Sequence, residues 1–476
     1  MENFHPTGMT VDPNYWVKAI EAGKAIRQKV PRTSHGVWKP SGKRAGILEQ
    51  VKASNEGRLP DLIPLRHQRM SESAFAFLRG MPPTMANDLA TTPNTGLFVQ
   101  ACGDAHLMNF GLFASPERVL MFDITDFDET HQAPWEWDVK RLAVSVAIAA
   151  RSAPLELDDT VQCSMVMGTV ASYRQHLREY SRMTHREIWH AKLTSDDLLS
   201  SSPNPRAQER LNGSLQHALS RTGARLLQKI TSVDESGSLK INEEPPSIIH
   251  EAEGDLSRDA ILQTLIQYRD TLQEDRRALL ERYTILDAAR KVVGVGSVGT
   301  RCGMALLRAD DGDTLFLQIK EARQSILEPM TSPCPYDHQG MRVVIGQRMM
   351  QSASDAFLGW TQSPSGLPFY VRQLRDMKAS VPLVEISAGQ LREYAKLCGW
   401  CLARAHAKSG NSTLISGYLG KADTFDRAIG QFALAYADQN EKDYQAYMKG
   451  KAAGELGTEM RSVPRTKSLP GPPGPG

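Results

Sequence analysis

An aspartate and an asparagine lie five residues apart in the segment GDAHLMN, residues 103–109. Phosphoryl transfer needs a carboxylate that accepts the proton of a substrate hydroxyl, and hard oxygen ligands that hold Mg²⁺ against the phosphates. We therefore interpret Asp104 as a catalytic base and Asn109 as a Mg²⁺ ligand. Gly103 relieves crowding where this loop turns.

A second group of acids follows the next predicted strand, in the segment FDITDFDE that contains Asp123, Asp126 and Asp128. Asp126 directly follows the strand and precedes an aromatic residue, so we predict it as the second Mg²⁺ ligand, with Asp128 as an auxiliary ligand. For any single residue the alternative stays open that it only satisfies a turn or lies in a solvated acidic loop.

A glycine-rich segment, GVGSVG at residues 294–299, precedes the strand FLQIK that ends at Lys320. The glycine pattern alone fits both a Rossmann turn and a kinase Gly-rich loop. A Rossmann turn must open a helix, whereas the residues that follow here read as strand, turn and strand. We expect ATP phosphates to bind the Lys320 ammonium and the loop residues Gly294, Gly296, Ser297 and Gly299. The alternative is a tight glycine hairpin with a surface lysine.

The order of these two regions is the reverse of that in a kinase, where the glycine loop precedes the Asp-x-x-x-x-Asn loop. Residues 369–376 resemble the strand and hinge between kinase lobes, and residues 399–407 resemble the helix ahead of the catalytic loop. Reading 292–410 and then 97–151 restores the kinase order, which a circular permutation explains. The expected partner glutamate of Lys320 is missing, and Gln347 or Glu328 is a candidate replacement.

The predicted fold class is α+β, a protein-kinase-like two-lobed fold that is circularly permuted and carries a large helical insertion. The predicted parts are an N-terminal extension (1–63), the catalytic-loop part of the larger lobe (64–154), a helical segment (155–290), the smaller lobe with the glycine loop and the lysine strand (291–378), further larger-lobe helices (379–450) and a disordered Pro/Gly-rich tail (451–476).

Sequence patterns predict helices at 13–29, 137–151, 157–183, 207–230, 259–290 and 388–449, and strands at 95–101 and 119–124. Residues 66–89 read as a short strand or a helix pair. In the helix at 137–151, Asp138 lies near the N-terminus, where a carboxylate can cap free backbone amides.

The 476 residues carry a formal charge of only +2. This balance predicts no nucleic-acid partner, because phosphate-backbone binding needs a concentrated basic patch. The apolar stretches are too short to span a membrane, and the start lacks a secretory signal, so we expect a cytoplasmic protein with a small-molecule substrate. The sequence is silent on oligomeric state.

Two thiols, Cys398 and Cys401, have thioredoxin-like spacing, but their flanks read as one amphipathic helix. We interpret them as core residues rather than a redox or zinc site. Three arginines, Arg66, Arg69 and Arg79, either hold an anion or pair with surface acids, and we favour ion pairing.

The spacing from Asp126 to Asp138 of WDVKRLA resembles aminoglycoside and choline kinases, in which a metal aspartate precedes a helix start. Those enzymes also carry a histidine two residues after the catalytic aspartate, as His106 stands here, and the resemblance implies a catalytic-site role for it. Residues 64–438 resemble an uncharacterised bacterial family, the domain of unknown function 2252, in stretches such as GDAHLMNFG, PWEWDVKRLAVS and KVVGVGSVGTR. That resemblance implies a bacterial protein but no reaction.

The leading hypothesis is ATP-dependent transfer of phosphate to a small-molecule hydroxyl. A nucleotide-sensing pseudokinase, AMP transfer on the same fold and a carboxylate-metal hydrolase are the alternatives. The hydrolase leaves the glycine loop and Lys320 unexplained.

Overall fold

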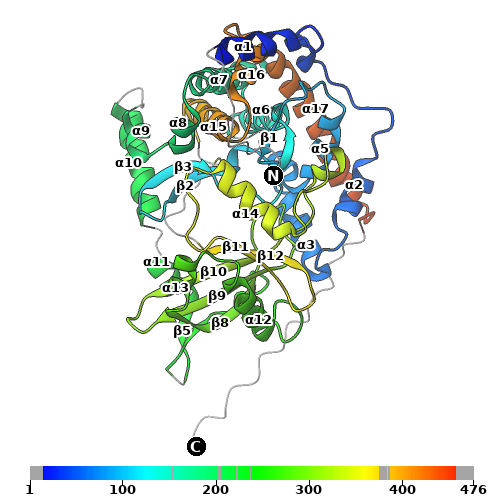
Figure 1. Ribbon diagram of the computed structural model, residues 1–476. Helices are drawn as coiled ribbons and strands as arrows, with labels where there is room; N and C mark the ends of the chain where they lie inside the picture. Colours follow the sequence, from blue (N-terminus) through cyan, green and yellow to red (C-terminus); the bar gives the residue numbers. More distant parts are fainter. Residues whose placement is uncertain are drawn as a thin grey trace, which may run out of the picture.

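The computed structural model describes residues 14–152, 154–200, 205–220, 223–235, 237–374, 383 and 386–456. It is a mixed α/β structure in which long helices gather at one end and the largest sheet lies at the other (Figure 1). No helix in these ranges is both long and apolar enough to cross a membrane.

The α-helices are α1 (Tyr15–Ile26), α2 (Ile47–Ser54), α3 (Ile63–Met70), α4 (Ala74–Gly80), α5 (Pro82–Ala90), α6 (Trp135–Arg151), α7 (Asp159–Tyr180), α8 (His185–His190), α9 (Ser195–Ser200), α10 (Pro205–Leu219), α11 (Gly223–Ile230), α12 (Arg258–Arg269), α13 (Glu274–Leu280), α14 (Gln339–Met350), α15 (Ala388–Ser409), α16 (Ser412–Leu419) and α17 (Thr424–Ala452). The strands are β1 (Phe98–Ala101), β2 (Phe110–Ala114), β3 (Leu120–Ile124), β4 (His131–Pro134), β5 (Thr231–Val233), β6 (Leu239–Ile241), β7 (Ile248–Ile249), β8 (Tyr283–Lys291), β9 (Cys302–Ala309), β10 (Thr314–Glu321), β11 (Gly359–Gln362) and β12 (Pro368–Gln373).

The largest sheet has the strand order β11-β12-β10-β9-β8-β7, and all of its neighbouring strands are antiparallel. The glycine segment connects β8 to β9, and β9 and β10 form the predicted hairpin. Lys320 lies on β10 between Cys302 of β9 and Tyr370 of β12. Alternating apolar residues on these strands pack into two buried clusters on the sheet.

Two small ladders hold the segment from β1 to β4. Strand β1 pairs with β4, and between them the chain forms the β2–β3 hairpin, in which Phe110 lies opposite Ile124. The ends of this hairpin therefore bring Asn109 next to Thr125, whose backbone N–H donates to the Asn109 carbonyl at 2.9 Å. This pairing places the loop of Asp104 beside the loop of Asp126.

Helix α6 forms the centre of the helical end. Its residues from Trp135 to Ala150 are all buried, and the helix packs against α7, α15 and α17. Burial on every side is expected of a helix at the middle of a large core rather than on its surface. The helix thus provides a fixed platform for the loops that begin at β1.

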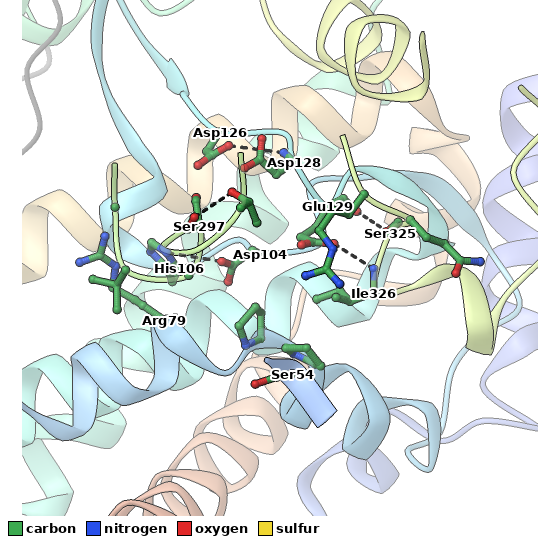
Figure 2. A pocket seen from close by; sticks show the side chains of 18 of the residues that line it. Ser54, Arg79, Asp104, His106, Asp126, Asp128, Glu129, Ser297, Ser325 and Ile326 are labelled. Carbon is green, nitrogen blue, oxygen red and sulfur yellow. Dashed lines mark hydrogen bonds and ion pairs between the residues drawn. The ribbon is translucent and has the colours of Figure 1, made fainter. Parts of the chain in front are cut away.

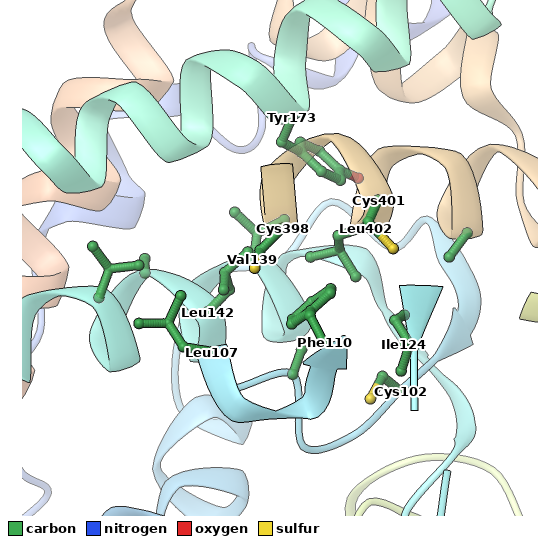
Figure 3. Close-up of a cluster of buried hydrophobic side chains, with 14 of the residues drawn as sticks. Cys102, Leu107, Phe110, Ile124, Val139, Leu142, Tyr173, Cys398, Cys401 and Leu402 are labelled. Atoms are coloured by element: carbon green, nitrogen blue, oxygen red, sulfur yellow. The ribbon is translucent and has the colours of Figure 1, made fainter. Parts of the chain in front are cut away.

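Cys398 and Cys401 lie in the interior of α15, as the helical flanks predict. Figure 3 shows both thiols among apolar side chains, close to Phe110, Leu402 and Tyr173. Burial raises the pKa of both thiols well above the ordinary value, so they remain protonated and unreactive.

The structure corrects several predicted bounds. The helix expected at 259–290 is instead α12, α13 and strand β8, and the sheet already begins with β7 at Ile248 rather than near residue 292. The segment 155–290, expected to be helical, also contains the short strands β5, β6 and β7. The nine-residue strand β8, Tyr283–Lys291, contains Leu, Ala, Arg and Lys, which helices also favour. Tertiary pairing with β9 decides its state.

Other expectations differ by less. Residues 66–89 contain helices only, and the single predicted helix at 388–449 is divided into α15, α16 and α17. The predicted disordered tail starts inside α17, which reaches Ala452, and its residues 457–476 lie outside the described residues. The predicted hinge at 369–376 is described only to 374.

Candidate active site

The loop that carries Asp104 is fixed by its neighbours on both sides. Gly103 has a φ of +82°, and a Cβ at this position would lie 2.4 Å from the Glu129 carbonyl oxygen. Only glycine fits such a close approach at positive φ. The loop therefore packs directly on the segment that follows Asp128.

The sequence suggested that the Asp138 carboxylate caps its own helix, but the structure shows no side-chain cap there. The carboxylate accepts hydrogen bonds from the backbone N–H groups of Cys102 at 2.6 Å and Gly103 at 3.0 Å. His406 Nε2 lies 3.2 Å from the same carboxylate, and His406 Nδ1 lies 2.9 Å from the Tyr173 hydroxyl. This buried chain from α6, α15 and α7 holds the backbone just before Asp104.

The Asp104 side chain is held on one oxygen and faces the cavity with the other. Arg141 of α6 donates to Asp104 Oδ1 at 2.9 and 2.7 Å. Asp104 Oδ2 lies 3.6 Å from His106 Nε2. Burial lowers the pKa of His106 to about 4, although the charge of Asp104 opposes this. The imidazole is therefore neutral at pH 7 and can orient a partner but not act as an acid there.

The side-chain amide of Asn109 is hydrogen-bonded through its nitrogen but not through its oxygen to any described residue. Its Nδ2 donates to the carbonyls of Asp104 at 3.0 Å and Asp126 at 3.1 Å. Its buried Oδ1 has no hydrogen-bond partner among the described residues. A buried oxygen without a partner is costly unless a ligand satisfies it. With the Asp126 and Asp128 carboxylates nearby, these oxygens have the donor chemistry that Mg²⁺ prefers.

Among the described residues there is no group of three or more His, Cys, Asp or Glu side chains arranged to hold a metal. Mg²⁺ bound with a nucleotide takes one or two carboxylates, and phosphates and waters supply the remaining ligands. The oxygen set of Asn109, Asp126 and Asp128 fits that mode of binding, and it does not fit a preformed protein cage.

Lys320 reaches across from β10 to the acids that follow β3. Its Nζ lies 2.6 Å from Asp128 Oδ2 and 3.8 Å from Asp126 Oδ1. Burial would lower the pKa of Lys320, but these two carboxylates outweigh it and hold the pKa well above its ordinary value. Tyr370 of β12 donates to Asp128 Oδ1 at 2.5 Å, so Asp128 is held from two strands of the sheet.

Neither proposed replacement for the missing glutamate contacts Lys320. Gln347 of α14 donates to Gln351 at 2.8 Å, and Glu328 accepts from the Cys334 N–H at 3.1 Å. The carboxylate partner of the lysine is instead Asp128, from the loop after β3. Sequence spacing could not reveal this pair, because the two residues are 192 positions apart.

The glycine segment is tied to the helices near the N-terminus. Gly294 and Gly299 have φ values of +68° and +91°, and a Cβ on Gly296 would lie 2.9 Å from the Arg79 carbonyl oxygen. Arg58 donates to the carbonyls of Gly296 at 2.8 Å and Val298 at 2.6 Å. The loop carbonyls are thus occupied by a cation from outside the sheet.

Many of these groups line one cavity of about 700 Å³. Figure 2 shows Asp104, His106, Asp126, Asp128 and Ser297 around it. The predicted residues that line it are Asp104, His106, Asn109, Asp126, Asp128, Gly294, Gly296 and Ser297. Lys320 is buried behind Asp128, and Gly299 packs against Arg58. Lining residues that sequence reasoning did not select are Arg58, Glu129 and Glu321.

The prediction that Arg66, Arg69 and Arg79 pair with surface acids is wrong, because none of them forms an ion pair with a described residue. Arg66 donates to Asn55, Ser54 and the Gly80 carbonyl, and Arg69 donates to the Gly294 carbonyl. Arg79 lines the cavity, and its Nη1 donates to the Met108 sulfur at 3.4 Å. All three are used inside the fold or at the cavity.

Glu129 is a half-buried acid at the cavity wall. Its Oε2 accepts from the Ile326 N–H at 2.9 Å, and its carbonyl accepts from Ser325 Oγ at 2.7 Å (Figure 2). Burial raises the pKa of Glu129 to about 7. The acidic run TDFDET marked this region in the sequence, but nothing in it distinguished a half-buried acid from solvated ones.

Glu129→Gln is expected to change how stability depends on pH. The unfolded carboxyl loses its proton near pH 4.5 and the folded one near pH 7, so wild-type stability falls as pH rises through this window and is level above it. The neutral variant avoids this loss and gains about 2–3 kcal/mol relative to wild type at pH 8 compared with pH 4. Urea unfolding in EDTA without nucleotide measures this difference, and parallel pH curves for the two proteins would contradict it.

The site thus combines three features at one cavity: a glycine loop, a buried lysine paired with Asp128, and a loop that carries Asp104 and Asn109. The chain belongs to DUF2252, a family of uncharacterised proteins conserved in bacteria, whose model matches residues 58–450. Neither the curated proteins nor the solved structures contain a significant match.

Proposed function

We propose that the protein is an ATP-dependent phosphotransferase that acts on a hydroxyl group of a small molecule, on a kinase-like two-lobed fold. The observation that carries the proposal is the ion pair of Lys320 with Asp128 and Asp126. It joins the glycine-loop region to the Asp104 region at one cavity, although the two are far apart in the chain.

In the proposed reaction, the acceptor hydroxyl attacks the γ-phosphorus of ATP and gives its proton to Asp104 Oδ2. A bond forms between the acceptor oxygen and phosphorus, the bond to the β–γ bridging oxygen breaks, and ADP leaves. Arg141 holds the other oxygen of Asp104, so the base is oriented before the acceptor binds. Bound Mg²⁺, held by Asn109 and Asp126, would neutralise phosphate charge.

Strand order supports the kinase-like part of the proposal. From β8 onward, the sheet has in chain order a strand, the glycine loop, two strands, helix α14 and two more strands, with Lys320 on the third of these strands. The Asp104 loop, the β2–β3 hairpin and Asp126 follow one another as a kinase catalytic loop and metal loop do. Asp138 supports the catalytic loop from a central helix.

A contact between distant segments supports the permutation. Helix α15 ends at Ser409, whose Oγ donates to the Gln100 carbonyl of β1 at 3.5 Å across 309 positions of the chain. A Cβ on Gly410 would lie 2.6 Å from Val99 Cγ1. The end of α15 thus meets the start of β1, where a kinase that is not permuted continues directly from one to the other.

Thermal stability with ATP, with and without Mg²⁺, tests the proposal in wild type, Lys320→Ala and Asp126→Ala. Ligand at a hundredfold excess over its dissociation constant adds about 2.7 kcal/mol. We expect a Mg²⁺-dependent rise in Tm for wild type that both substitutions abolish. A folded wild-type protein that shows no rise would exclude the nucleotide site.

A nucleotide-binding protein without turnover is the second candidate. It is favoured by the absence of an acid on α14 near Lys320 and by the tight pairing of Lys320 with Asp128. Labelled ATP separates the candidates: label transferred from the γ position indicates phosphotransfer, label transferred from the α position indicates AMP transfer, and binding without transfer indicates a sensor.

A further inference from the structure

Arg79 lines the cavity and forms no ion pair with any residue that the structure describes. Among the same residues its buried Nε has no hydrogen-bond partner, and its Nη1 reaches only the Met108 sulfur at 3.4 Å. Burial lowers the pKa of Arg79, and the charges of Asp104 and Asp126 only partly oppose this. Burying a cation without a partner is unfavourable, so the site gains stability when an anion binds there.

The two other arginines that line the cavity donate to backbone carbonyls. Arg58 donates to the carbonyls of Ser54, Gly296 and Val298, and Arg323 donates to the Glu56 carbonyl at 2.7 Å. Arg323 is exposed and keeps further N–H donors. Among the described cavity arginines, Arg79 differs in having a buried Nε without a hydrogen-bond partner. A planar guanidinium with free N–H groups matches a carboxylate or a phosphate in two-point hydrogen bonding.

The position of Arg79 connects it with the acceptor rather than with the nucleotide. Its backbone contacts Gly296, and Figure 2 shows the side chain beside His106 on the same side as Asp104. Lys320 lies behind Asp126 and Asp128 and does not line the cavity. Beyond Arg79 the cavity continues along α2 and α5, where Gln50, Ser54 and Asn87 line it.

We propose that Arg79 binds an anionic group of the acceptor, so that the substrate is a hydroxyl compound that itself carries a phosphate or carboxylate. This inference rests on the proposed function for the identity of the reacting hydroxyl. The anion fixes one end of the acceptor and leaves its hydroxyl at Asp104, which supplies the orientation that phosphoryl transfer requires.

Inorganic phosphate serves as the probe, titrated by calorimetry into wild type, Arg79→Met and Arg427→Met. Arg79→Met keeps the length of the side chain and removes its charge, and Arg427 is an exposed control arginine with 58% of its side chain accessible. Each titration is done with a saturating non-hydrolysable ATP analogue and Mg²⁺, and again without them. Arg79→Lys, which keeps the charge without the planar fork, gives an intermediate case.

We expect phosphate to bind wild type and Arg427→Met with equal affinity. It should bind Arg79→Met at least tenfold more weakly and Arg79→Lys with intermediate affinity. The affinity for the ATP analogue should be unchanged in all four proteins. Equal phosphate binding in wild type and Arg79→Met, or none in wild type, would overturn the proposal. Loss of analogue binding in Arg79→Met would also overturn it, by assigning the residue to the nucleotide. If wild type binds phosphate through Arg79 but no analogue, the anion site stands and the proposed function fails.

Discussion

Asp104→Asn is expected to lower phosphate transfer by a factor of about 10² to 10⁴, the usual contribution of a general base. The substitution keeps the size of the side chain and an oxygen that can accept from Arg141, but it cannot take the proton of the acceptor. Nucleotide affinity should change little, because Lys320 and the glycine loop are untouched. Single-turnover transfer from γ-labelled ATP and calorimetry with the ATP analogue measure the two quantities.

Asn109→Asp is a useful comparison because it adds a carboxylate where Asp104→Asn removes one. It keeps the oxygen that has no partner but loses the N–H donors to the carbonyls of Asp104 and Asp126. We expect it to disturb Mg²⁺ dependence more than Asp104→Asn does. Transfer by Asp104→Asn at the wild-type rate would remove Asp104 from the reaction.

Short-range patterns were sufficient to select most of the candidate site. The Asp-x-x-x-x-Asn spacing, the glycine pattern and the strand before Lys320 each lie within about twenty residues, and each corresponds to a local element that the structure contains. The predicted hairpin follows from alternating apolar residues around an Asp/Gly-rich turn. What such patterns specify is a loop or a strand and the chemistry of its side chains.

Contacts between distant parts of the chain were beyond such patterns. The pairing of Lys320 with Asp128 and the support of the Asp104 loop by Asp138 depend on tertiary packing. The same is true of Arg79, whose sequence context does not reveal whether an acid lies nearby. Strand β8 shows the limit for secondary structure, since its pairing with β9 overrides a local composition that also suits a helix.

Asp123 and Asp126 lie three residues apart in the same acidic run, yet the structure gives them opposite roles. Asp123 is fully buried and pairs with the fully buried Arg404 at 2.7 Å. It also accepts from the N–H of Ser352 at 2.8 Å and from its hydroxyl at 2.6 Å. Asp126 lines the cavity with 41% of its side chain exposed. Position along the chain explains part of this difference, because Asp123 is within β3, whose residues are all buried, and Asp126 is beyond its end.

Asp123→Ala is expected to destabilise the fold by about 3–5 kcal/mol, the cost of leaving a buried charge without its partner. Among the described residues, Arg404 Nε and Nη1 have no hydrogen-bond partner, so without Asp123 the guanidinium would keep only the Met350 carbonyl, which accepts from Nη2 at 2.7 Å. Urea unfolding of Asp123→Ala and of the matched control Asp126→Ala, both without nucleotide, measures the difference. The control should lose no more than about 1 kcal/mol, because Asp128 still pairs with the buried Lys320.

The double substitution Asp123→Ala with Arg404→Met separates charge from packing. If the cost comes from an unpaired guanidinium, removing that guanidinium should recover much of the stability, because a buried ion pair contributes little net free energy compared with apolar side chains of similar volume. If Asp123→Ala and Asp126→Ala unfold at the same urea concentration, the buried pair is not what holds β3 against α15. We expect Asp126→Ala to be the most stable variant, the double variant to come next and Asp123→Ala to be the least stable. This order follows because only Asp123→Ala leaves a fully buried charge without its partner.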